Sequence, residues 1–138
     1  MAKDKYTSAE FRAAIKSKSI TVGAKKGDKE KAHMLSVIMR IFKDSRFAIY
    51  HGKNELKFSP DRKFKFDYAI ASLTGNEIRI GIEYEGLMSE KSGHTTVIGY
   101  TSNTEKYNLA CILGWKVLRY TALNYKNLES DLKALINH

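Results

Sequence analysis

Residues 63–71, KFKFDYAIA, and residues 78–85, IRIGIEYE, are two runs in which apolar residues recur at every second position. That period is typical of strands that turn one face toward a core. The residues between the runs include TGNE at 74–77, a turn signal. We therefore expect a hairpin of adjacent antiparallel strands.

The alternation assigns each side chain of the hairpin to a face. The apolar face is expected to carry Phe64, Phe66, Tyr68 and Ile70 from the first strand and Ile78, Ile80, Ile82 and Tyr84 from the second. The opposite face then holds Asp67, Glu83 and Glu85. Three carboxylates are thus predicted on one side of two neighbouring strands.

Helical patterns surround the hairpin. We expect a short helix over 7–17, a basic loop over 18–29, a core helix over 29–43, a long loop over 86–103, a helix over 104–113, a strand over 115–121 and a closing helix over 124–136. Gly114 is a C-terminal cap signal for the helix before it. Trp115, Leu118 and Cys111 are expected in the core. The order predicts an α/β fold with a mixed sheet flanked by helices.

The overall composition limits the class of protein. A chain of 138 residues with 43% hydrophobic residues suggests one globular domain. The single cysteine, Cys111, excludes an internal disulfide framework and a cysteine-based zinc site. No apolar run approaches the roughly 20 residues of a membrane span, and the first ten residues lack a signal-peptide core. We expect a cytoplasmic protein without a membrane partner.

The charge is concentrated in the first half of the chain. Residues 1–65 hold 17 Lys and Arg against 7 Asp and Glu, whereas residues 66–138 hold 7 against 8. The net charges are +10 and −1, which together give the +9 of the whole chain. Such a half would attract a polyanion, with nucleic acid the commonest candidate, or would simply be a solvated surface.

The three carboxylates favour a metal if they converge. Like charges held together raise one another's pKa, and a divalent cation removes that penalty. Oxygen ligands favour Mg²⁺ or Mn²⁺ over zinc, and Asp67 with Glu83 or Glu85 would suffice for Mg²⁺. The alternative is a solvated sheet face on which the glutamates pair with Lys65 and Arg79.

Three motifs in this order resemble a known superfamily. FKFDYAIA, IRIGIEYEG and EKYNLACILGWKVLRYT are similar to motifs of the PD-(D/E)XK nucleases, especially the very-short-patch-repair-like branch and small phage nucleases and junction resolvases. The resemblance covers roughly residues 28–122. It implies a restriction-endonuclease-like αβββαβ core with a four-stranded mixed sheet, preceded by a basic segment over 1–27 and followed by a helix in 123–138.

The resemblance also implies roles for the acidic residues. Asp67 matches the central metal ligand, and Glu83 matches the second ligand. Glu85 stands where most members carry a lysine, so it would be a metal ligand or a general base. Glu30 resembles the glutamate of the first helix, although an acidic residue at a helix N-terminus is an equally good reading.

A positive group would then have to come from elsewhere. Lys106, on the helix after the hairpin, and His94, in the long loop, are the candidates. An ordinary loop histidine is as good an interpretation of His94. Arg119 lies on the exposed phase of its strand and would reach a phosphate or Glu85.

The implied function is an Mg²⁺-dependent endonuclease that acts on DNA. The small size favours recognition of branched, junction or nicked DNA, and a two-fold homodimer would suit two symmetric cuts. RNA is not excluded as a substrate. The missing motif lysine leaves a second hypothesis open, a non-catalytic nucleic-acid-binding module that keeps the nuclease fold.

Overall fold

The computed structural model describes residues 27–75, 78–86 and 96–137, so the helix expected over 7–17 lies outside these ranges. The main elements are α2 (Asp28–Ile41), β1 (Phe47–His51), β2 (Tyr68–Ser72), β3 (Arg79–Tyr84), α3 (Val97–Ile112), β4 (Lys116–Tyr120) and α4 (Leu128–Ile136), with short 3₁₀ turns at Gly52–Asn54 and Tyr125–Asn127. The strands form one open mixed sheet in the order β1-β2-β3-β4, as expected of an α/β fold.

Strand direction follows from the connections. β1, β2 and β3 are antiparallel neighbours, and β4 is parallel to β3. Parallel neighbours need a crossover, and α3 supplies it. The predicted hairpin of β2 and β3 is confirmed, with Tyr68 opposite Ile82 and Ile70 opposite Ile80.

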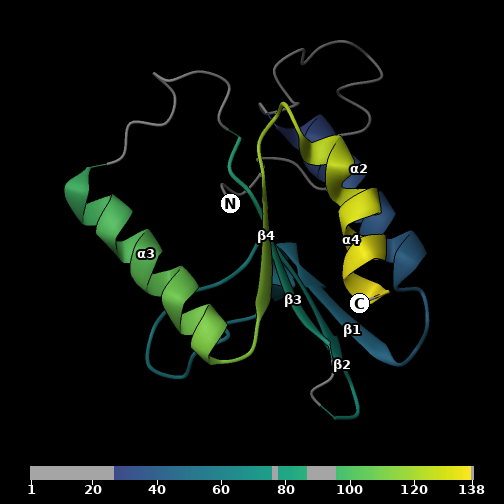
Figure 1. Cartoon of the computed structure of the whole chain (residues 1–138), viewed down its shortest axis with the longest axis horizontal. Coiled ribbons are helices and arrows are strands. Elements are labelled where there is room, and N and C mark those ends of the chain that lie inside the picture. Colours follow the sequence, from purple (N-terminus) through teal and green to yellow (C-terminus); the bar gives the residue numbers. More distant parts are fainter. Residues whose placement is uncertain (1–26, 76–77, 87–95, 138) are drawn as a thin grey trace.

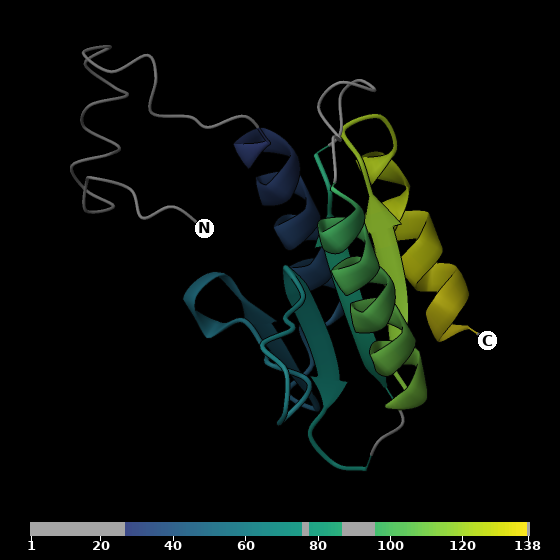
Figure 2. The ribbon, with the colours of Figure 1, turned by 90° about the vertical axis from the view of Figure 1, so that its left-hand side faces the viewer.

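Helices cover both faces of the sheet. Figure 1 shows the sheet nearly edge-on, with α3 on one side and α2 and α4 on the other. In Figure 2 the same α3 stands in front of the strands. Both faces of the central strands are therefore buried, which differs from the single buried face that the alternation predicts.

The α2–α4 side holds the larger core. Helix α2 contributes Met34, Val37 and Ile38, and α4 contributes Leu128 and Leu132, all at most 1% exposed. They pack on the apolar face of the hairpin. Burying each such side chain fully contributes about 1.5–3 kcal/mol, so this layer accounts for much of the stability.

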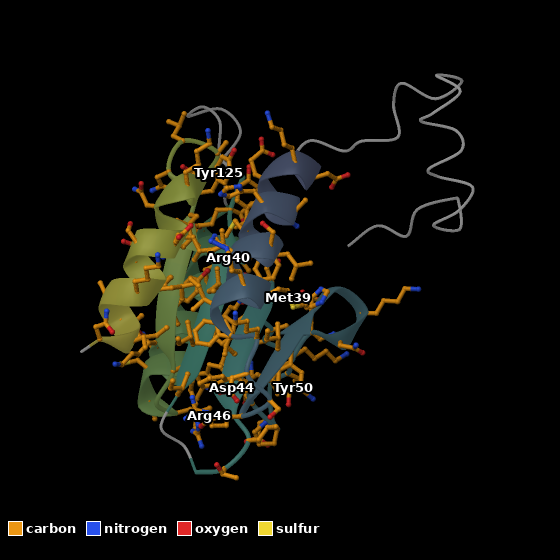
Figure 3. The ribbon with its side chains drawn as sticks, turned by 90° about the vertical axis from the view of Figure 1, so that its right-hand side faces the viewer. Met39, Arg40, Asp44, Arg46, Tyr50 and Tyr125 are labelled. Carbon is orange, nitrogen blue, oxygen red and sulfur yellow. The ribbon has the colours of Figure 1, made fainter. Side chains whose placement is uncertain are left out.

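Helices α2 and α4 also meet at the surface. Arg40 Nη2 and Glu129 Oε1 lie 2.7 Å apart and join the two helices. Figure 3 views the protein from this side, with α2 and α4 next to each other and Arg40 and Tyr125 labelled.

A second, aromatic cluster lies under α3. Phe58, Phe66, Ala69 and Ala110 are buried there, with Trp115 packed against them. The Phe66 ring stacks on that of Phe58, with centroids 4.4 Å apart, and lies 5.4 Å from that of Trp115. The expected core role of Trp115 is therefore confirmed.

The position of Phe66 corrects the predicted strand phase. Phe66 lies under α3, whereas Tyr68 and Ile70 face α2 and α4. The reason is that β2 begins only at Tyr68, so the alternation does not continue back through Asp67.

The expectations drawn from the residue pattern were incomplete or wrong at three further points. No strand was predicted from the residue pattern at Phe47–His51, where β1 forms an edge strand whose five residues are all half-buried. Helix α3 begins at Val97, inside the predicted long loop, with Thr96 as its cap. Cys111 is exposed rather than in the core, because it lies on the outer side of α3.

No helix in the described ranges is both long and apolar enough to cross a membrane.

Candidate functional site

Asp67 and Glu83 meet where β2 begins and β3 nears its end. The backbone N–H of Tyr84 donates to Asp67 Oδ2 at 2.8 Å, and the backbone N–H of Asp67 donates to Glu83 Oε2 at 3.1 Å. Each acidic side chain thus accepts a hydrogen bond from the opposite strand. Both bonds run from a backbone N–H to a side-chain oxygen. They lie just beyond the Tyr68–Ile82 pair and fix both carboxylates at one end of the sheet.

Lys106 completes this group from α3. Its Nζ donates to Glu83 Oε1, and the side chains of Lys106 and Glu83 are only 14% and 10% exposed. The Lys106 ammonium lies 5.5 Å from the centre of the Phe66 ring and 5.6 Å from that of Tyr107. Lys106 therefore lies beside the Glu83 carboxylate, and its role as the positive group of the site stays a prediction.

Gly81 makes room for the ring under Lys106. A Cβ at Gly81 would lie 2.6 Å from two carbons of the Phe66 ring, which is closer than side chains pack. Gly81 also sits opposite Ala69, another small residue. The small residues on these strands let Phe66 lie against the sheet beneath Glu83 and Lys106.

Burial dominates the electrostatics of Glu83. It raises the pKa of Glu83 to about 7, although the hydrogen bond and charge of Lys106 oppose the shift and Asp67 adds to it. Glu83 is 8% exposed, and Arg79 donates instead to the carbonyl of Leu113 at 2.7 Å. The alternative of a solvated glutamate paired with Arg79 is therefore wrong for Glu83.

Glu85 has a different partner. Arg119 donates to both of its carboxylate oxygens, at 3.0 and 2.7 Å, and the guanidinium lies 4.2 Å from the centre of the Tyr107 ring. The hydrogen bond to Glu85 raises the pKa of Arg119, and burial followed by the charge of Glu83 raises that of Tyr107 to about 12. Arg119 thus reaches Glu85, one of its two predicted contacts.

The three carboxylates do not gather as one group. The described part of the chain contains no set of three or more His, Cys, Asp or Glu side chains that could hold a metal ion. Asp67 and Glu83 remain adjacent, and Asp67 is only half-buried. Because Mg²⁺ usually takes one or two protein carboxylates plus water and phosphate oxygens, this pair still fits the expected cation.

The remaining predicted site residues are Glu30 and His94. Glu30 is in the first turn of α2, where its charge adds to the burial that raises the pKa of Tyr84. Among the described residues, no hydrogen bond or ion pair joins Glu30 to Asp67 or Glu83. His94 falls outside the described ranges, so its proposed role stays a prediction.

A pocket beside Asp67 was not expected from the sequence. It has a volume of about 280 Å³ and lies between α2 and the start of β2, with His51, Glu55, Lys31 and Leu35 on its wall. His51 ends β1 and Glu55 follows the next turn, so neither could be placed once that strand was missed.

Comparison with protein-family models, curated proteins and solved structures found no match to this chain. The resemblance to the PD-(D/E)XK nucleases therefore rests on the sequence motifs and stays a prediction.

Proposed function

We propose that this protein is a metal-dependent endonuclease that hydrolyses phosphodiester bonds of DNA, with branched, junction or nicked DNA as the preferred class. Asp67 and Glu83 would hold Mg²⁺ or Mn²⁺. In most of the superfamily a lysine at the position of Glu85 supplies a positive charge to the site. We assign that role to Lys106.

One observation supports this most strongly. Glu83 is nearly buried, accepts from both Lys106 and the backbone of Asp67, and has a raised pKa. Groups with such perturbed pKa values concentrate at functional sites, because a purely structural role is met more cheaply by an apolar side chain.

The element order gives independent support. Helix α2, strands β1 to β3, helix α3 and strand β4 follow one another as the family resemblance implies for a restriction-endonuclease-like core. Strand β4 also lies parallel to β3, with Arg119 in register with Glu83. The finer fold assignment is part of the same proposal.

The residues of the chain have distinct tasks in this proposal. A bound Mg²⁺ or Mn²⁺ would polarise the phosphodiester and make a water more acidic. Lys106 holds the Glu83 carboxylate in place and brings a positive charge to the site where negative charge grows on the phosphate. Arg119 keeps Glu85 neutralised beside this group.

Incubation of branched, nicked and linear DNA with Mg²⁺ or Mn²⁺ tests the proposal. We expect cleavage that is lost in Asp67→Asn and retained in the control Asp44→Asn, which changes an exposed carboxylate paired with Arg46. Electron paramagnetic resonance of Mn²⁺ should show binding that Asp67→Asn weakens and Asp44→Asn does not. No cleavage of any substrate, with Mn²⁺ binding equal in all proteins, contradicts the proposal.

A non-catalytic nucleic-acid-binding module is the second candidate. It is favoured by the ion pair that already neutralises Glu83 and by the lack of a third acidic ligand within the described ranges. In that case DNA binds but is never cut, and Asp67→Asn leaves the affinity unchanged.

A further inference from the structure

The connection between β1 and β2 carries a concentrated positive charge. Residues 53–65, which we call the basic arm, contain five cations and two acidic residues: Lys53, Lys57, Arg62, Lys63 and Lys65 against Glu55 and Asp61. The net of +3 is a third of the +9 of the whole chain. The arm ends two residues before Asp67, next to the proposed site.

Arg62 and Phe58 hold the arm against the rest of the protein. Arg62 pairs with Glu105 of α3 at 3.1 Å and lies 4.3 Å from the centre of the Phe64 ring. Phe58 is buried against Phe66 in the aromatic cluster, so the backbone of the arm is held beside α3 (Figure 2).

Two lysines of the arm face each other. Lys57 and Lys65 form an antiparallel bridge, which places their side chains on the same side of the two chain segments. Both are exposed, and among the described residues neither forms an ion pair with a carboxylate. Like charges directly opposite each other are unfavourable in a bare protein, and an anion between them would relieve the repulsion.

We infer that the basic arm binds the phosphodiester backbone of the DNA strand that enters the site, with Lys57 and Lys65 contacting phosphates next to the one at Asp67. The inference rests on the proposed function for the identity of the anion. The spacing along the chain supports it, because Lys65 and Asp67 are separated by one residue, the buried Phe66.

The salt dependence of DNA binding tests the inference without requiring cleavage. Each neutralised phosphate contributes about 0.9 to the slope of log affinity against log salt concentration. We therefore expect Lys57→Gln/Lys65→Gln to lower that slope by about 2. Fluorescence anisotropy with a short labelled duplex, in buffer without divalent cations, gives the slope.

A matched control removes the same charge elsewhere. Lys43→Gln/Lys116→Gln also lowers the net charge by two, and both lysines are exposed, one after α2 and the other at the start of β4. The control should keep the wild-type slope. Equal slopes for all three proteins, equal losses in both variants, or no binding by the wild type at low salt would overturn the inference. Binding through the arm without cleavage of any DNA leaves the inference standing and refutes the nuclease.

Discussion

Glu83 should make the stability of this protein depend on pH in an unusual direction. Its pKa is raised from an ordinary 4.5 to about 7, chiefly by burial. The folded protein therefore binds a proton more tightly at Glu83 than the unfolded chain does. The contribution of this group to stability is complete below pH 4.5 and is lost as the pH rises toward about 7.

The magnitude follows from the pKa gap. A difference of one pH unit corresponds to about 1.4 kcal/mol, so the gap from 4.5 to about 7 amounts to about 3 kcal/mol. That is a large part of the roughly 5–15 kcal/mol that stabilises a typical domain. It should be visible in ordinary unfolding curves.

Glu83→Gln is the informative substitution, because it keeps the size of the side chain and removes its titration. In glutamine an NH₂ group, which only donates, replaces one of the two carboxyl oxygens, so either Lys106 Nζ or the backbone N–H of Asp67 loses its acceptor and we expect a loss of about 1 kcal/mol. The variant should thus be slightly less stable than the wild type at pH 4.5. By pH 8 it should be more stable by about 2 kcal/mol.

Denaturant unfolding followed by tryptophan fluorescence measures this difference. Trp115 is the only tryptophan, and it packs against Phe58 and Phe66 near the site. Glu129→Gln is the control, because the hydrogen bond from Lys133 lowers the pKa of Glu129, so the contribution of Glu129 to stability is present above about pH 4.5 and is lost as the pH falls below it. Its effect should therefore have the opposite sign.

A flat difference between wild type and Glu83→Gln from pH 4.5 to 8 would refute the reasoning. It would mean that Glu83 titrates in the folded protein as it does in the unfolded chain. Lys106→Met provides a second check, because loss of the opposing cation should move the midpoint of the difference to higher pH.

Three other substitutions, one of them with a matched control, test the layers around the site by the same unfolding assay. Gly81→Ala should lower stability by about 1–3 kcal/mol, because its Cβ would overlap the Phe66 ring, and unchanged stability would contradict that contact. Leu132→Ala removes a fully buried side chain of α4 and should cost about 2–5 kcal/mol, whereas Leu123→Ala, at a residue 84% exposed, should change stability by no more than about 0.5 kcal/mol. Arg119→Met breaks a largely exposed ion pair with Glu85, so a loss above about 1 kcal/mol would show that the pair matters more than its exposure suggests.

The hairpin could be predicted from sequence because its alternation is long and regular. The pattern predicted that Asp67 and Glu83 lie on the same side of neighbouring strands, and the structure brings them into contact just beyond the Tyr68–Ile82 pair. Strand β1 could not be found in this way, because it has only five residues and all of them are half-buried, so exposed polar residues do not alternate with buried apolar ones. The start of α3 was missed because Val97 and Ile98 are apolar but more than 80% exposed, which hides any helical stripe.

Contacts between distant segments were harder to predict. The approach of Lys106 to Glu83 was expected only from a family resemblance, because nothing in the sequence of α3 fixes which of its faces meets the sheet. The pairing of Glu85 with Arg119 depends on β4 lying next to β3, and a single sequence leaves that neighbour undefined.

The break in alternation at Asp67 explains how the site is built. Had the strand continued backward in phase, Phe66 would lie with Tyr68 on the α2–α4 side. Instead its ring lies under α3, over Gly81 and 5.5 Å from Lys106 Nζ. An apolar ring at that position removes water from the Glu83–Lys106 pair and so raises the pKa of Glu83. Asp67, where the alternation breaks, is also the residue whose carboxylate accepts a hydrogen bond from the backbone N–H of Tyr84 on the neighbouring strand.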